Sequence, residues 1–414
     1  MTISVWLDDD QWQEPQEGEI QKFDLVIVGA GLNGLGLAYF AHQKAPGLRV
    51  LVLDAGKLGF GASGRNGGFV LRGIHAYYEA CIAQYGRDKA RSIYQFGVDN
   101  QALIRKFIED HDLDLQQVFS GSYLLASSLE EMDELARSAQ LMSEDGFNVQ
   151  FFPTDPLDRG FYGAMHNPDD FGINPFRFCQ ALRTISSVPI SENEAVRRIE
   201  SLGSGELKIT TNRRHLIAER VYLATNAYSG LIETYFVDKI KPARGQMIAT
   251  APLKKIYVNE LCYANYGWEY FRQLPDRRLI LGGCRQLFIE EETGFQDLIT
   301  PGIQQALESY LKDHFPEIGL QRLLDTRGDE IEHRWSGAMA FTDDGLPLVG
   351  EMAECPHLYY AVGCNGHGLG YSMRLAQLAC DMVFGDKPAE LSIFDKEPAS
   401  QRRRRLTVSD LEGP

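Results

Sequence analysis

The hydrophobic pattern near the start of the chain predicts two buried strands separated by a helix. FDLVIV (23–28) and LRVLVLD (48–54) are short and almost continuously apolar, which is typical of parallel strands buried on both faces. Between them, LGLAYFAHQKA (35–45) is rich in helix-forming residues and stops at Pro46-Gly47. Together they predict one β-α-β unit of about 30 residues.

Further along the chain, the hydrophobic pattern predicts amphipathic elements in place of fully buried strands. Amphipathic helices are predicted over 75–113 and 129–145, extended alternating strands over 239–290, and a further helix over 302–315. Buried strands like those of the first unit are predicted again later in the chain. They are RVYLATNA (220–227) and the strand, glycine turn and helix within the last 60 residues. The chain is therefore expected to cross several times between two interleaved domains.

Length and composition agree with a two-domain globular protein. The 414 residues are 44% hydrophobic and 24% charged, and no run reaches the roughly 18 to 20 apolar residues of a membrane helix. The N-terminal segment is acidic and polar, so we expect no secretory signal and a cytoplasmic protein. We place the first domain at 20–75, 175–237 and 335–395, the second at 76–174 and 238–334, and terminal extensions at 1–19 and 396–414.

Charge and cysteine usage narrow the class of partner. The formal net charge of −16 disfavours nucleic-acid binding and mildly favours cationic substrates. The basic run RRRR (402–405) lies in a polar tail and is predicted to be a solvated end. The seven cysteines are scattered without a CxxC pair, so neither a disulfide framework nor a metal site is expected.

The turn after the first strand has the spacing of a dinucleotide-binding loop. Gly29, Ala30, Gly31 and Gly34 form GxGxxG between a buried strand and a helix, and Asp54 ends the next strand, 20 residues after Gly34. The glycines let backbone approach a pyrophosphate at the helix N-terminus, and Asp54 can accept hydrogen bonds from ribose hydroxyls. An acidic residue at that point disfavours the 2′-phosphate of NADP.

A second glycine-rich stretch, GFGASGRNGG (59–68), favours FAD over NAD. FAD continues past the pyrophosphate into a ribityl chain and a flat ring, against which bare backbone can lie closely. The predicted contacts come from Ala62, Ser63, Arg65, Asn66, Gly67 and Gly68.

These motifs, followed in order by LATNAY (223–228), PARGQ (242–246) and VGCNGHG (362–368), resemble the FAD-dependent D-amino-acid oxidase superfamily. That superfamily includes glycine oxidase, sarcosine oxidase and, nearest by its ASGRNGG segment, the γ-glutamylputrescine oxidase branch. The resemblance implies a Rossmann-like FAD-binding domain interleaved with an α+β substrate domain on a mixed or antiparallel sheet. It also implies cofactor contacts from Val196, Thr225, Asn226, Gly337, Gly363, Gly366, His367, Gly368 and Leu369.

The last predicted helix has a physical reason to face a flavin. Hydride transfer to flavin N5 places negative charge at N1 and the C2 oxygen, which free N–H groups at a helix N-terminus stabilise. Its first residues, from Gly366 to Leu369, would supply those groups. His367 can act there, or can cap the helix or pack on the sheet while the backbone acts.

The segment YGWEYFRQ (266–273) is predicted to line the substrate side of the active site. On a strand, Trp268, Tyr270 and Arg272 share one face, and relatives use Tyr and Arg to hold a substrate carboxylate. Tyr270 and Arg272 are candidates for those parts, with Arg72 as another carboxylate holder or flavin contact. Packing in the sheet explains Tyr270 or Arg272 equally well.

Two departures from the resemblance bear on the chemistry. Ala338 and Met339 stand where some sarcosine-oxidase relatives have a cysteine that tethers FAD, which predicts non-covalent FAD. Ile280 stands where those relatives carry an oxygen-activating lysine, so oxygen and another electron acceptor both stay open.

The predicted function is oxidation of the C–N bond of an amine or amino acid by hydride transfer to FAD, giving an imine that hydrolyses to an aldehyde or oxo acid. One alternative is an FAD-dependent 2-hydroxy-acid dehydrogenase with His367 as base. Another is a non-catalytic FAD-binding subunit. D-amino acids, secondary amines such as sarcosine, and polyamine derivatives all stay open as substrates.

Overall fold

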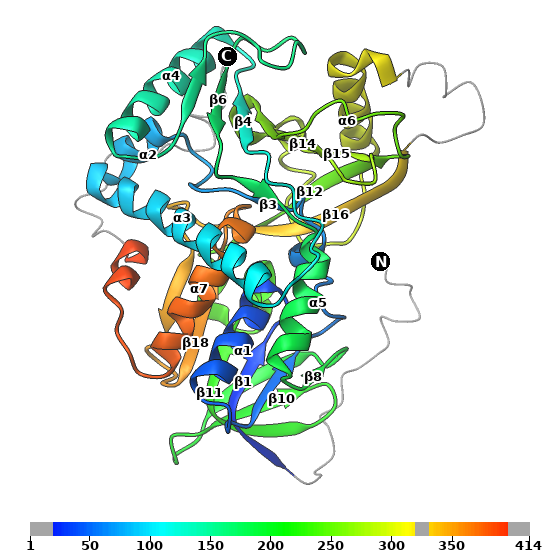
Figure 1. Ribbon diagram of the computed structural model, residues 1–414. Coiled ribbons are helices and arrows are strands. Elements are labelled where there is room, and N and C mark those ends of the chain that lie inside the picture. The colour runs from blue at the N-terminus through cyan, green and yellow to red at the C-terminus, as the bar shows by residue number, and fades with distance from the viewer. Residues whose placement is uncertain (1–19, 319–330, 396–414) are drawn as a thin grey trace.

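The computed structural model describes residues 20–318 and 331–395. Two eight-stranded sheets dominate it, with a short two-stranded sheet of β3 (Phe69–Val70) and β7 (Phe171–Gly172) as a third element. Figure 1 shows the two large sheets in separate lobes. The basic run at 402–405 lies outside the described residues.

The first sheet has the order β17-β18-β11-β1-β2-β8, with β10 and β9 added through β11. Strands β18, β11, β1, β2 and β8 run parallel, whereas β17 and β10 pair antiparallel with their neighbours. The strands span β1 Gln21–Val28, β2 Val50–Leu53, β8 Ile190–Ser191, β9 Val196–Ser201, β10 Leu207–Thr211, β11 His215–Leu223, β17 Leu348–Glu351 and β18 Leu358–Val362.

Helices cover one face of this sheet and build its core. α1 (Leu32–Lys44) packs on α5 (Pro175–Ser186) and α7 (Gly368–Val383), and α7 also packs on α3 (Arg87–Asp110). Gly36 permits the close approach of α1 to α7, because a methyl group built on it would lie 2.8 Å from Ala376 Cβ. The predicted β-α-β unit is confirmed as β1, α1 and β2.

The second sheet has the order β16-β12-β15-β14-β13-β4-β6-β5 and is antiparallel except for the β13–β4 pair. Helices α2 (Tyr78–Tyr85), α4 (Leu129–Glu144) and α6 (Pro301–His314) belong to the same lobe (Figure 1). The strands span β4 Ser122–Leu125, β5 Gln150–Phe152, β6 Ala164–Asn167, β12 Lys241–Thr250, β13 Leu261–Ala264, β14 Glu269–Gln273, β15 Leu279–Gly282 and β16 Ile331–Phe341.

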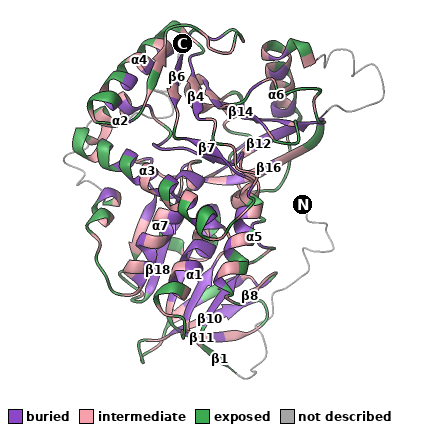
Figure 2. Ribbon diagram, viewed as in Figure 1, coloured by how far each residue is buried: buried purple, intermediate pink, exposed green. Residues whose placement is uncertain are grey.

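The chain crosses between the lobes several times, and β16 is the last strand of the second sheet. It pairs with β12 along almost its whole length, with Gly337 opposite Gly245. By strand pairing, residues 335–341 therefore lie in the second sheet, and the chain returns to the first sheet at β17. Figure 2 shows buried residues concentrated on the strands of both sheets and on the inner faces of the helices.

Several features of the described residues bear on the class of protein. No helix in that part of the chain is both long and apolar enough to cross a membrane. The cysteines are free thiols, and residues 20–318 and 331–395 hold no group of three or more potential metal ligands.

Candidate cofactor and substrate site

The predicted cofactor residues lie along one edge of the first sheet. Because β18, β11, β1, β2 and β8 are parallel, the loops that follow them emerge at the same edge, where ligands of such sheets bind. In spatial order these loops carry Gly363 to Leu369, then Thr225 and Asn226, then the Gly29–Gly34 turn, then Asp54, and last Val196. Four strand spacings of about 4.8 Å make this edge roughly 19 Å wide.

The Gly29–Gly34 turn is built for close backbone packing. Gly29 has φ +112°, and a methyl group on Gly34 would lie 2.0 Å from the Gly29 carbonyl oxygen. The turn opens α1, whose first N–H groups have no acceptors within the helix. Of these, Leu32 N–H donates to Ser63 Oγ at 2.9 Å. The two glycine segments are therefore joined directly.

Asp54 sits at the end of β2 and fixes the same turn. Its two carboxylate oxygens accept the N–H groups of Ala30 at 2.7 Å and Gly56 at 2.8 Å. Burial raises its pKa, and these two hydrogen bonds oppose that shift. A carboxylate oxygen accepts more than one hydrogen bond, so both oxygens keep capacity for ribose hydroxyls.

Polar side chains of the 59–68 segment hold its own backbone in place. Asn66 Nδ2 donates to the carbonyls of Ala62 and Ser63, and Asn66 Oδ1 accepts the Gly68 N–H. Gly68 has φ +74°, and a methyl group there would lie 2.1 Å from the Ile173 carbonyl oxygen. Beside Gly61, by contrast, no atom lies within 4 Å. The segment thus combines a fixed backbone with an open side.

Arg65 connects this segment to the second lobe. Its guanidinium forms a two-pronged ion pair with Asp297 at 2.9 and 3.1 Å and also donates to the carbonyls of Phe60 and Ser336. The Arg65 carbonyl in turn accepts Trp335 Nε1–H at 2.7 Å. Gly337 follows Ser336 on β16, and a methyl group there would lie 3.4 Å from Arg65 Cβ.

The N-terminus of α7 lies at the other end of the edge. Asn226, in the left-handed region at φ +44°, accepts the N–H groups of Gly363 and Cys364 at 3.0 and 3.2 Å and so fixes the turn before the helix. Thr225 lies beside it and pairs with the Ser229 hydroxyl. Gly366, at φ +77°, is exposed, so its backbone is open to a ligand.

His367 is the N-cap residue of α7, but its side chain makes no cap hydrogen bond. Its Nδ1 lies 3.1 Å from the Asn365 carbonyl oxygen, and its ring stacks on Tyr263 with centroids 6.3 Å apart. Burial lowers its pKa. A hydrogen on Nδ1 would donate to that carbonyl and leave Nε2 as an acceptor.

His75 is a second imidazole in this region, which the sequence did not single out. A methyl group on Gly345 would lie 2.3 Å from its Cε1, so the ring lies against that turn. The residue as a whole is exposed to solvent. Even so, the surrounding protein desolvates it and, with His367 nearby, lowers its pKa to about 4.

The lowered pKa of His75 predicts a loss of stability in mild acid. The unfolded chain takes up the proton near the ordinary pKa of 6.5, before the folded protein does, so the free energy of unfolding falls as pH drops from 6.5 to about 4. Below that window the contribution stays lost. His75→Gln is expected to flatten part of this dependence in thermal midpoints measured across the window. A variant with the same pH slope as the parent would contradict the assignment.

Aromatic and methionine side chains gather at the N-terminus of α7. Tyr270 and Tyr263 stack with ring centroids 5.7 Å apart, and a methyl group on Gly366 would lie 3.6 Å from Met339 Sδ and 4.0 Å from Phe341 Cζ. Burial raises the pKa of Tyr270 to about 12, so its hydroxyl stays protonated at neutral pH. We call the region where these side chains and His367 meet the chamber.

The two arginines predicted to hold a carboxylate are both occupied by protein acceptors. Arg272 is 4% exposed and donates to the carbonyls of Gly68 at 3.1 Å and Ile173 at 2.9 Å. Burial lowers its pKa to about 10. Arg72 is 8% exposed and donates to Asn167 Oδ1 and the Asn148 carbonyl. The Nε atom of each is buried without a hydrogen-bond partner among the described residues.

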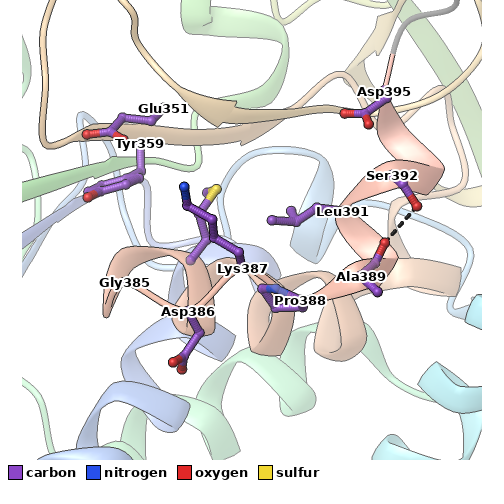
Figure 3. Close-up of a pocket in the computed structure, with 11 residues that line it drawn as sticks. Glu351, Tyr359, Gly385, Asp386, Lys387, Pro388, Ala389, Leu391, Ser392 and Asp395 are labelled. Carbon is purple, nitrogen blue, oxygen red and sulfur yellow. Dashed lines mark hydrogen bonds between the residues drawn. The ribbon is translucent and has the colours of Figure 1, made fainter.

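A surface hollow of about 440 Å³ lies elsewhere, at the C-terminal end of α7. Figure 3 shows Glu351, Tyr359 and Lys387 around it. The 16 residues of α7 separate it from the chamber by roughly 22 Å at 1.5 Å per residue. We do not assign the hollow to the cofactor or substrate.

The donor set of the edge fits FAD. Two helix N-termini face it, a carboxylate ends β2, and glycines at 29, 31 and 34 allow a tight turn in which a Cβ would meet protein atoms. A parallel sheet with this edge, joined to an antiparallel sheet that closes one end, defines the class of two-domain flavin-dependent oxidoreductases.

Comparison with known proteins agrees. The family model described as "DAO: FAD dependent oxidoreductase" matches residues 24–382, and the chain belongs to this family. It is 26% identical over 406 residues to the probable oxidoreductase OrdL of Haemophilus influenzae, covering 93% of this chain and 88% of that one. It is 25% identical to the γ-glutamylputrescine oxidoreductase of Escherichia coli, covering 88% and 84%.

Among solved structures, glycine oxidase from Geobacillus kaustophilus has the same fold, with a TM-score of 0.75, 22% identity, and coverage of 90% of this chain and 98% of that one. The predicted family and fold class are confirmed. Sequence reasoning did not indicate that Tyr263 and His75 would lie near His367. The spacing of aromatic residues over 263–270 could have indicated Tyr263. No comparable pattern surrounds His75.

Proposed function

We propose that this FAD-dependent oxidoreductase oxidises the C–N bond of an amine or amino acid. The observation that carries the proposal is the order of groups along the sheet edge, which ends with the α7 N-terminus facing the chamber. Bound FAD would accept a hydride from the carbon next to nitrogen, and the resulting imine would hydrolyse to a carbonyl compound and ammonia or an amine.

The chain's own residues would orient the substrate and stabilise charge. The free N–H groups of α7 would stabilise negative charge on the cofactor. Tyr263, Tyr270 and Met339 would exclude water and align the substrate C–H. His367 and His75 are neutral at pH 7 by their lowered pKa values, and the same shift makes both imidazoles weak proton acceptors for an ammonium substrate. An amine that enters neutral needs no protein base.

We propose that FAD is held non-covalently. Met339 and Ala338 carry no nucleophile, and Ala338 is 7% exposed on β16. Acid precipitation is then expected to leave the flavin in solution, and flavin retained in the precipitate would oppose this. Ile280 is 6% exposed and packs with Met247 and Ala249, so the side chain at this position is not a cation that activates oxygen.

Anaerobic reduction across a substrate panel tests the function. We expect amines or amino acids to bleach the visible absorbance of the oxidised flavin, and 2-hydroxy acids to leave it unchanged. Repeating the panel in air separates oxidase from dehydrogenase by the rate of recolouring. If no amine or amino acid reduces the flavin, the proposal fails, and a non-catalytic flavin-binding role gains support.

His367→Ala separates the amine reaction from the 2-hydroxy-acid alternative, in which a base must take the hydroxyl proton. We expect the variant to keep flavin reduction by a neutral amine, because that reaction draws on the backbone of α7. His333→Ala, an exposed histidine on β16, is the matched control. Near-total loss of reduction in His367→Ala alone would favour the hydroxy-acid chemistry.

A further inference from the structure

The segment 295–299 joins two points that are fixed to the second sheet. Before it, the Gly294 N–H donates to the Pro242 carbonyl on β12 at 2.9 Å. After it, the Thr300 N–H donates to the side-chain oxygen of Gln246, on the same strand, at 3.2 Å. We call the five residues between these points, 295–299, the strap. Both ends of the strap are therefore held on β12.

Two side chains of the strap contact the first lobe. The Asp297 carboxylate accepts two hydrogen bonds from the Arg65 guanidinium, at 2.9 and 3.1 Å. The Phe295 ring lies against the Tyr228 ring with centroids 5.8 Å apart, and it packs on the apolar core of the first sheet. The strap thus extends from the second lobe onto the first, where an ion pair and an aromatic contact hold it.

These two contacts lie on opposite sides of the Gly29–Gly34 turn. Tyr228 belongs to the loop after β11 and Arg65 to the segment after β2, whereas the turn follows β1, the strand between them. Two strand spacings separate β11 from β2, roughly 10 Å, which three extended residues and their side chains span. Burial raises the pKa of Tyr228. Arg65 opposes this shift, and Asp54 and Asp297 add to it, so charges from beyond the turn reach this ring.

The contacts of the strap with the first lobe are of a kind that opens without unfolding. The side chains of Arg65 and Asp297 are 20% and 41% exposed, and partly exposed ion pairs stabilise only modestly. Leu298 and Ile299 are 40% and 44% exposed, so they bury little apolar surface. Segments with few buried contacts open locally more readily than the core. The strap can therefore leave the first lobe while its ends stay on β12.

We propose that the strap closes over the diphosphate region of bound FAD and that its opening limits both release and entry of the cofactor. The proposal goes beyond the oxidation reaction and rests on non-covalent FAD. The ion pair of Arg65 with Asp297 joins two protein residues, so it holds the strap closed in the free and the FAD-bound protein alike. Weakening it raises the rates of entry and release together and changes the dissociation constant much less. Loss of a simple contact with FAD would raise the release rate alone.

FAD release from the purified holoprotein tests the proposal. The rise of free-FAD fluorescence after dilution gives the release rate constant, and its final value over a dilution series gives the dissociation constant. Their ratio is the rate constant of entry. We expect Asp297→Asn to raise both rate constants about three- to tenfold and to change the dissociation constant by less than about threefold. The matched control is Asp276→Asn, which removes a 44% exposed carboxylate paired with Arg278 inside the second lobe and should match the parent.

Phe295→Ala weakens the strap without a change of charge and should also raise both rate constants, with circular dichroism as the check on folding. Salt screens an exposed ion pair. At about 1 M NaCl the ratio of the Asp297→Asn rate to the parent rate should therefore fall towards one, whereas the ratio for Phe295→Ala should persist.

The proposal is overturned if Asp297→Asn releases FAD within twofold of the parent. It is equally overturned if release accelerates while the rate constant of entry stays unchanged, because that is the result for a simple contact. Flavin retained in an acid precipitate would overturn non-covalent attachment and the strap together. If no amine or amino acid reduces the flavin, the proposed function fails, whereas the release and entry rates still decide the role of the strap.

Discussion

Gly68→Val is expected to purify with about tenfold less flavin per protein than the parent, or less still. A non-glycine residue in the left-handed region costs roughly 1–2 kcal/mol, and each 1.4 kcal/mol corresponds to a factor of about ten in the dissociation constant of the flavin. The new Cβ would also lie 2.1 Å from the Ile173 carbonyl oxygen. That contact would displace the backbone that Asn66 and Arg272 hold. The ratio of flavin absorbance to protein absorbance measures the effect.

Gly61→Ala is the control within the same segment. Gly61 has φ −69°, and no protein atom lies within 4 Å of a methyl group placed there, so the fold should accommodate it. Circular dichroism of Gly68→Val separates lost flavin from lost folding. A folded Gly68→Val protein with full flavin content would contradict the placement of this segment against the cofactor.

Arg244→Met is expected to produce the largest loss of stability, about 3–5 kcal/mol, because it leaves the Glu292 carboxylate buried without its partner. Arg244 is 4% exposed and Glu292 is 0% exposed. Arg244 also donates to Gln296 and the Glu291 carbonyl, so it holds the loop before α6 against β12. Thermal unfolding of the flavin-loaded protein should show a midpoint several degrees lower.

Two further variants separate burial from charge. Arg244→Met combined with Glu292→Leu removes both charges and should recover part of the stability. Arg278→Gln breaks an ion pair whose side chains are 27% and 38% exposed and should cost at most about 1 kcal/mol. If Arg244→Met unfolds at the same temperature as Arg278→Gln, the buried pair does not have the proposed structural role.

The first sheet and the cofactor edge are predictable from sequence because their signals are local. Gly29, Gly34 and Gly68 are required by the backbone at their own positions, and parallel strands bring the distant loops to one edge. Asp54 is predictable for the same reason, because it follows the strand that pairs with the one before the glycine turn. Their spacing along the chain therefore indicates the cofactor edge, although Gly29 and Gly68 also pack against the distant carbonyls of Ala224 and Ile173.

The substrate side is much less predictable because its side chains meet partners from distant segments. Arg272 has the residue type of a carboxylate holder, yet its acceptors are the carbonyls of Gly68 and Ile173. Arg285 shows the reverse case. Its local sequence, Arg285–Leu287, does not indicate that the rings of Trp268 and Phe341 will lie beside it. Which groups surround an arginine is decided by packing between strands, and that information is absent from spacing alone.

A single-turnover measurement tests the central claim most directly. The purified flavoprotein is mixed anaerobically with the best amine or amino acid from the panel, and reduced flavin is compared with released ammonia or amine. We expect one equivalent of nitrogen product for each flavin reduced, because breakage of the C–N bond follows hydride loss. Flavin reduction without release of ammonia or an amine would contradict it.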